Sequence, residues 1–227
     1  MASRRASDRL IQTGKVKING AVITHPGTRV DPEADQVYVD GQPIRLVDQQ
    51  TYVLLHKPPG YLVSAHDPHH AQTVYNLLKG IDARIFPVGR LDLDTSGVLL
   101  LTDDGDLAFR LTHPRYGVEK VYRAIVRGQP DQEALKTLGQ GVALEDGMSA
   151  LANVKMVRKV GENAELELVL HEGKKRQVKR MCLAVGHRVQ SLTRTHFAGL
   201  STRNLSLSHW RYLTDDEVTR LRELVQL

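Results

Sequence analysis

The sequence predicts an α+β protein, with a mixed, mostly antiparallel sheet in one large domain and a small α/β domain before it. Two observations support this prediction. Short apolar or alternating runs typical of strands are interspersed with helix-like segments from residue 52 to the end. Residues 1–45 hold one helix and a few short strands, too little to bury a good core alone. We therefore expect domains at residues 1–47 and 52–227, joined by a polar linker around residues 45–51.

The small domain is expected to open with a helix over residues 3–13. Ser3 can cap the start of this helix, and Gly14 is a natural end for it. Two short strands should follow, each ending at a dipeptide typical of tight hairpin turns: residues 15–18 before Asn19-Gly20, and residues 37–39 before Asp40-Gly41.

The large domain shows both strand and helix patterns. Strands are expected at residues 52–55, 98–101, 121–126 and 164–170. Helices are expected at residues 73–78, 106–111, 132–138, 176–184 and 215–224. Thr214 and Glu217 have the spacing of a capping box for the last helix.

Composition is ordinary for a globular protein, with 41% hydrophobic and 25% charged residues. There is no run of about 18 apolar residues for a membrane span, and the basic N-terminus lacks the apolar region of a secretory signal. A single cysteine, Cys182, excludes an internal disulfide framework and is expected in the core. We expect a cytoplasmic protein that does not contact membranes.

Positive charge is concentrated in two places. The formal net charge is +5, yet residues 173–214 hold nine Lys and Arg and no acid. Residues 1–17 hold five basic residues against Asp8 alone. Such stretches attract phosphates and indicate a polyanionic partner, although two solvated basic faces would give the same pattern.

The segment from Gly89 to Gly97 is the strongest candidate for chemistry, because Asp92 and Asp94 stand directly before an apolar strand. An Asp-rich turn that caps the strand is one interpretation. Paired acid and base carboxylates are another. A calcium loop with Ser96 and Asp103 is a third, although the apolar strand fills positions where ligands belong. His66, His69 and His70 could suggest a metal, but no Cys or acidic set is spaced to join them, so no metal site is expected.

Three ordered motifs resemble those of the RsuA family of ribosomal RNA pseudouridine synthases. GRLDLDTSG at residues 89–97, read on into LLLTDDGDLAFRLTHP, is similar to that family's catalytic motif. VEKVYRAIV at residues 118–126 and EGKKRQVKRM at residues 172–181 are similar to its second and third motifs. Residues 3–23 resemble the RNA-binding domain named after the S-four ribosomal protein, and the first helix usual in that domain is expected to be missing.

The resemblance implies roles for individual residues. Asp92 would be the essential catalytic carboxylate, Tyr122 would stack on a flipped-out base, and Lys179 would pair with Asp92. Arg90 would fill the gap left by the flipped-out uridine. The basic residues expected to bind substrate RNA are Arg176, Arg180, Lys174, Lys175, Arg4 and Arg5.

Elementary chemistry agrees with these roles. Pseudouridine forms when the C1′–N1 bond breaks, the uracil rotates and C1′ joins C5, so no cofactor or metal is required, and none is expected. Flipping the base costs roughly a few kcal/mol, of which an aromatic face recovers about 1–3 kcal/mol. A nearby lysine keeps a partly buried carboxylate ionised. Attack on C1′ and removal of a sugar proton both remain open for Asp92.

We therefore expect a monomeric, RNA-binding enzyme that isomerises a uridine in ribosomal RNA, in 23S large-subunit RNA rather than 16S. The main alternative is a non-catalytic RNA-binding or ribosome-assembly protein on the same fold. A metal-dependent hydrolase using the Asp-rich segment is a further one.

Overall fold

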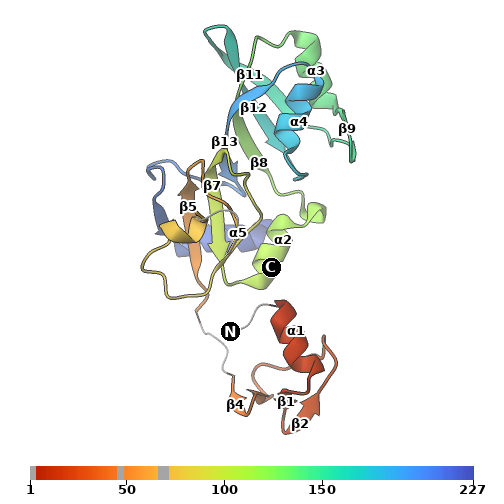
Figure 1. Ribbon diagram of the computed structural model, residues 1–227, viewed down its shortest axis with the longest axis vertical. Coiled ribbons are helices and arrows are strands. Elements are labelled where there is room, and N and C mark those ends of the chain that lie inside the picture. Colours follow the sequence, from red (N-terminus) through yellow and green to blue (C-terminus); the bar gives the residue numbers. More distant parts are fainter. Residues whose placement is uncertain (1–3, 45–48, 66–71) are drawn as a thin grey trace. The chain divides into compact units, whose positions relative to one another are not determined.

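The computed structural model describes residues 4–44, 49–65 and 72–227. Its contacts divide the chain into two compact units, Met1–Gln50 and Thr51–Leu227 (Figure 1). The expected helix cap at Ser3 and most of the expected linker lie outside the described residues. The units are described separately below.

The small unit consists of one helix and one four-stranded sheet of order β2-β1-β3-β4. Its elements are α1 (Arg4–Gln12), β1 (Val16–Ile18), β2 (Ala21–Ile23), β3 (Val37–Val39) and β4 (Gln42–Pro43). Asn19 and Gly20 both have positive φ angles, 49° and 84°, which matches the two-residue turn expected between β1 and β2. The predicted helix and both predicted hairpins are confirmed.

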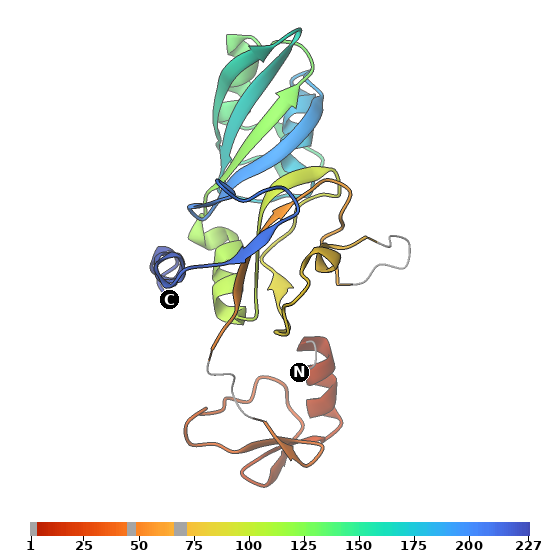
Figure 2. The same cartoon turned by 90° about the vertical axis from the view of Figure 1, so that its left-hand side faces the viewer.

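The large unit is built on a nine-stranded sheet, in which β11-β12-β8-β13-β7-β5-β15 lie side by side (Figure 2). Its strands are β5 (Tyr52–Lys57), β6 (Phe86–Pro87), β7 (Thr95–Thr102), β8 (Lys120–Val126), β11 (Asn153–Val160), β12 (Asn163–Leu170), β13 (Val189–Phe197), β14 (Leu200–Ser201) and β15 (Trp210–Tyr212). Only β13 and β7 pair in parallel among these described strands. The predicted mixed, mostly antiparallel sheet is confirmed.

In the described part of the large unit, four α-helices cover the sheet: α2 (Gly105–Thr112), α3 (Gln132–Gln140), α4 (Gln177–Ala184) and α5 (Asp215–Leu224). The capping box of α5 forms as predicted, because Thr214 accepts from the Glu217 amide and Glu217 accepts from the Thr214 amide. The helix expected at residues 73–78 is instead a single 3₁₀ turn, η1 (Val74–Leu77). A second 3₁₀ turn, η2 (Pro114–Tyr116), follows α2. None of the described helices is long and apolar enough to cross a membrane.

Three apolar clusters explain the strand patterns. The uniformly apolar strands β5 and β7 are buried on both faces: Leu54 and Leu100 face α2 and α5, while Leu55 and Leu99 face the segment around η1. The alternating strands β8 and β12 bury one face against α3 and α4, where Cys182 lies in the core as predicted. Figure 1 shows α3 and α4 at one end of the sheet and α2 and α5 at the other.

Strand β13 joins the two halves of the sheet. It pairs in parallel with β7 and antiparallel with β8. Leu192 lies opposite both Thr95 and Ala124 in the two registers, so β13 brings the start of β7 beside β8. This strand was not predicted from the sequence.

Gly97 is required where β7 meets β13. Its φ angle is +114°, and an added Cβ would lie 2.1 Å from the backbone oxygen of Arg194. We expect Gly97→Ala to lower the free energy of unfolding by about 3 kcal/mol, because the strands must separate and the backbone is strained. Gly105→Ala is the control, since that Cβ meets no atom within 4 Å. Equal stability of the two variants in urea unfolding would contradict this prediction.

Candidate active site

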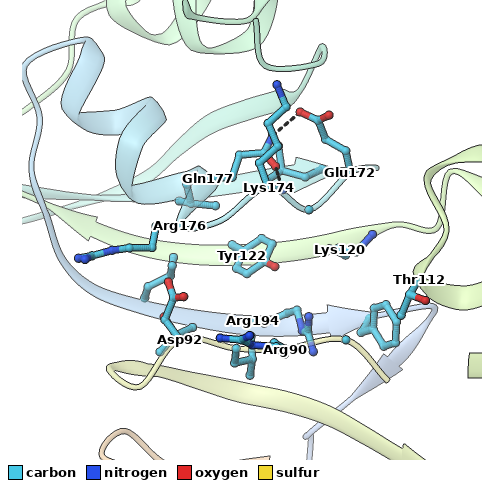
Figure 3. A pocket seen from close by; sticks show the side chains of 18 of the residues that line it. Arg90, Asp92, Thr112, Lys120, Tyr122, Glu172, Lys174, Arg176, Gln177 and Arg194 are labelled. Carbon is cyan, nitrogen blue, oxygen red and sulfur yellow. Dashed lines mark hydrogen bonds between the residues drawn. The ribbon is translucent and has the colours of Figure 1, made fainter. Parts of the chain in front are cut away.

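A cavity of about 250 Å³ opens where the end of the loop before β7 faces β8 and β13. Asp92 and Arg90 line it from the loop, Tyr122 and Lys120 from β8, and Arg194 from β13 (Figure 3). The structure therefore brings the predicted catalytic carboxylate and the predicted stacking tyrosine into one cavity. They are thirty residues apart in the chain, and the pairing of β13 with both β7 and β8 unites them.

A buried lysine fixes the loop that carries Asp92. The Lys57 side chain is fully buried, and its ammonium donates to the backbone oxygens of Thr95 at 2.8 Å and Asp92 at 3.1 Å. It also donates to the oxygens of Pro58 and Leu93. Burial lowers the pKa of Lys57 to about 8, while Asp94 and Asp92 oppose the shift. At the point where the loop enters β7, the ammonium thus supplies hydrogen bonds to backbone oxygens that a neighbouring strand would otherwise supply.

Lys179 of α4 contacts both acidic side chains of the loop. Its Nζ lies 3.7 Å from Asp92 Oδ2 and donates a hydrogen bond to Asp94 Oδ1. This hydrogen bond holds the pKa of Asp94 below its usual range. Lys179 thus contacts Asp92, as expected from the third motif, but makes its closer contact with Asp94. Because one lysine contacts both carboxylates and only Asp92 lines the cavity, the two do not flank a substrate as paired acid and base carboxylates would.

The start of the third motif forms the rim of the cavity opposite the loop. Gln177 is buried and donates to Glu172 Oε1 at 2.6 Å, and the Lys174 amide donates to Gln177 Oε1. Glu172 also accepts from the Ala150 amide. Figure 3 shows Glu172 and Gln177 joined in this way above Tyr122. These polar side chains of the motif therefore stabilise the loop to which they belong.

Two predicted RNA-binding residues make internal contacts with the hairpin of β9 (Ala143–Leu144) and β10 (Gly147–Met148). Lys174 Nζ donates to the Met148 oxygen at 2.7 Å. Arg180 forms two hydrogen bonds to the Asp146 carboxylate, at 2.8 and 3.0 Å. Both side chains hold this hairpin beside α4, and Lys174 also lines the cavity.

The other predicted substrate-binding residues are exposed. Lys175 and Arg176 lie just before α4, and Arg176 lines the cavity with its backbone in the left-handed region, at φ +52°. Arg90 is exposed at the cavity wall. Arg4 and Arg5 are exposed on α1 of the small unit.

Several basic side chains of the stretch over residues 173–214 form contacts within the protein. Lys179, Arg180 and Arg211 form ion pairs, the last with Glu217 at 2.7 Å. Arg194 is buried. The stretch as a whole is therefore not a free surface for the polyanionic partner that its charge indicated, because several of its charges hold the fold.

Three cationic groups of the site were not predicted from the sequence: Lys57, Lys120 and Arg194. Lys57 stands in a Lys-Pro-Pro-Gly segment that indicates the end of a strand. Its position directly after four apolar strand residues and His56 was the available signal, since a lysine that continues such a strand must be buried or end it. Lys120 stands in the second motif, two residues before Tyr122, and Arg194 stands in the basic stretch, but neither pattern assigned a role to these residues.

The acids that follow the loop have structural roles. Asp104 caps α2 by accepting from the Leu107 amide, and Asp103 accepts from the Thr51 amide. No three His, Cys, Asp or Glu side chains gather closely enough for a metal ion within the described ranges. His66, His69 and His70 lie outside those ranges.

Comparison with known proteins identifies the family of the chain. Residues 51–184 match the family model for RNA pseudouridylate synthases, and residues 1–37 match the S4 domain. An uncharacterized RNA pseudouridine synthase of Aquifex aeolicus is 44% identical over 100% of this chain and 91% of its own length. The ribosomal large subunit pseudouridine synthase B of Bacillus subtilis is 43% identical over 99% of this chain and 92% of its own length.

A solved structure extends this comparison to the fold. The crystal structure of a pseudouridylate synthase superposes with a TM-score of 0.70 at 27% identity, covering 96% of this chain and 94% of the other. These matches cover both units of the chain, including the segments that line the cavity. This protein belongs to the RNA pseudouridylate synthase family.

Proposed function

We propose that this protein converts one uridine of large-subunit ribosomal RNA to pseudouridine, with Asp92 as the catalytic carboxylate and without a cofactor. The observation that carries the proposal is the placement of Asp92 and Tyr122 in one cavity, with Lys179 3.7 Å from Asp92. The assignment to the large subunit is supported by the name of the Bacillus subtilis relative. We further propose that the protein acts as a monomer in the cytoplasm.

The cavity geometry suits a flipped-out nucleotide. Tyr122 offers an aromatic face on which a uracil can stack, and Asp92 approaches from the loop on the neighbouring wall. Lys179 places a positive charge 3.7 Å from this carboxylate, which both attack on C1′ and removal of a sugar proton would use in its anionic form. Arg90 lines the cavity and would enter the gap that the base leaves in the RNA.

RNA would be held outside the cavity mainly by contacts to phosphates. Lys175 and Arg176 are exposed beside the cavity, and Arg4 and Arg5 are exposed on α1 of the S4 domain. Lys174 and Arg180 would act less directly, because both hold the β9–β10 hairpin beside the cavity.

Pseudouridine mapping of ribosomal RNA tests this function. RNA from cells that lack the protein is compared with RNA from the same cells complemented with the wild-type gene. Loss of one pseudouridine in 23S RNA, restored by the gene, supports the proposal. A lost site in 16S RNA would overturn the choice of subunit, and an unchanged map would overturn the ribosomal substrate.

Tyr122 should contribute mainly through its ring. We expect Tyr122→Ala to reduce kcat/KM by roughly 10–100-fold, which corresponds to about 1–3 kcal/mol of lost stacking. Tyr122→Phe keeps the ring and should lose clearly less. Steady-state kinetics on unmodified ribosomal RNA measures both variants. If Phe is as damaging as Ala, the hydroxyl rather than stacking is the important group.

A further inference from the structure

Arg194 is a buried cation that pairs with none of the described carboxylates. It is 2% exposed, and its Nε and Nη2 both donate to the backbone oxygen of Val98, at 3.0 and 2.7 Å. The guanidinium lies 4.8 Å from the centre of the Phe197 ring. Within the described part of the chain it forms no ion pair. Buried charges are normally paired, so this one requires an explanation.

Lys120 places a second cation against the same ring. Its Nζ lies 5.9 Å from the centre of Phe197 and donates to the Val118 oxygen at 2.9 Å. No carboxylate lies within ion-pair distance among the residues described. Burial lowers the pKa of Lys120 to about 8, the charge of Arg194 acts in the same direction, and Glu172 opposes both. Glu172 is itself held by Gln177 and the Ala150 amide.

Both cations lie next to Tyr122 on the cavity side of the sheet. Lys120 and Tyr122 are two residues apart on β8, so their side chains point to the same face. Arg194 is the cross-strand partner of Tyr122, and Phe197 is the partner of Lys120. All four residues line the cavity (Figure 3). A base stacked on Tyr122 would therefore lie near two cations that have no ion-pair partner among the residues that the structure describes.

Pseudouridine formation creates a negative charge that could pair with these two cations. On either chemical route the C1′–N1 bond breaks and its electron pair passes to the uracil, whose charge spreads onto O2 and O4. C5 then bonds to C1′, the C5 hydrogen leaves as a proton, and N1 takes up a proton, so the product is an isomer of the substrate. Preorganised donors in a water-poor site stabilise such a developing charge strongly.

We propose that Lys120 and Arg194 bind the carbonyl oxygens of the flipped-out uracil and stabilise its negative charge while it is detached from the ribose. This assignment rests on the proposed function, and it makes both side chains catalytic residues beside Asp92. The depth of Arg194 favours the base over an RNA phosphate, because a phosphate remains on the backbone outside the pocket that receives the base.

The test compares Lys120→Met, Lys120→Arg and the wild type as full-length proteins. Arg194 is left unchanged, because its replacement would also free the Val98 oxygen. The substrate is 5-tritiated ribosomal RNA from cells that lack the protein, and the readouts are single-turnover release of tritium from C5 and RNA affinity by filter binding. Lys159→Met, at an exposed position of β11, is the matched control and should behave as the wild type.

We expect Lys120→Met to slow tritium release by about 10²-fold, as for the loss of one oxyanion donor, with unchanged RNA affinity. Lys120→Arg should retain most of the rate. The wild-type rate should fall as pH rises through about 8, since the neutral amine cannot offset the charge, and Lys120→Arg should lack that fall. The Lys120→Arg variant shows whether this fall in rate comes from Lys120 or from Lys57, because the pKa of Lys57 is also lowered to about 8.

Other results would overturn the assignment. Weaker RNA binding with an unchanged rate of tritium release would place Lys120 on a phosphate. An unchanged rate and affinity in Lys120→Met would remove it from the reaction. A rate in Lys120→Arg as low as in Lys120→Met, with equal losses of thermal stability, would show a structural role. Absence of tritium release by the wild type overturns the proposed function itself, and the assignment with it.

Discussion

Asp92→Asn is expected to abolish pseudouridine formation, with a loss of at least about 10⁴-fold in kcat, as when an essential nucleophile or base is removed. An amide can neither attack C1′ nor accept a sugar proton, whereas its shape still fits the cavity. The fold should persist, because the Asp92 side chain is 34% exposed and its partner Lys179 retains Asp94. Tritium release from 5-tritiated ribosomal RNA measures the loss.

Asp94→Asn is the matched control, since it removes the other carboxylate that contacts Lys179. Asp94 is absent from the residues that line the cavity. We therefore expect its variant to keep most of the activity. If Asp94→Asn were inactive and Asp92→Asn active, Asp94 rather than Asp92 would be the catalytic carboxylate. If both kept full activity, the carboxylate mechanism would be wrong.

Lys57→Met should show the largest loss of stability, about 4 kcal/mol or more in the free energy of unfolding. The methionine fills a similar volume but donates no hydrogen bond, so the oxygens of Pro58 and Thr95 lose this donor, while those of Asp92 and Leu93 keep the Thr95 and Gly60 amides. Each buried group left unsatisfied costs about 1–3 kcal/mol. Urea unfolding followed by circular dichroism measures the effect.

The same change should impair catalysis at temperatures where the variant remains folded, because the Asp92 loop loses its anchor. Lys79→Met is the control, as Lys79 is exposed. A Lys57→Met protein as stable and as active as the Lys79→Met protein would show that the loop is held by other contacts, such as the hydrogen bond from the Gly60 amide to the Leu93 oxygen.

The local elements could be predicted well because their signals are short-range. The Asn19-Gly20 turn, the capping box at Thr214 and the apolar runs of β5 and β7 each depend on residues close together in the chain. The helix expected at residues 73–78 was wrong, because Asn76 caps back onto the Thr73 amide and the turn ends after four residues.

The candidate site was predictable only where a motif carried it. Asp92 and Tyr122 stand in segments that resemble a known family, and they share one cavity. Lys57 had only the indirect signal of a lysine that continues an apolar strand, and Lys120 and Arg194 had none for burial, since the presence of a lysine or arginine in a sequence does not show whether its charge will be buried. Burial depends on what packs over the side chain, and those residues are distant in the sequence.

By itself, the sequence determined the fold class, most helices, the hairpin turns and the family to which the chain belongs. Only the tertiary structure decided that β13 enters the middle of the sheet, in parallel with β7 and antiparallel with β8. Its sequence, Val-Gln-Ser-Leu-Thr-Arg-Thr-His-Phe, shows no regular alternation of polar and apolar residues that would predict a strand. In the structure the strand bulges twice against β8 and buries an arginine, so its residues do not alternate strictly between the two faces of the sheet. Such a strand is stabilised by its neighbours on both sides rather than by local preference, and its position creates the cavity that Asp92, Tyr122 and Arg194 share.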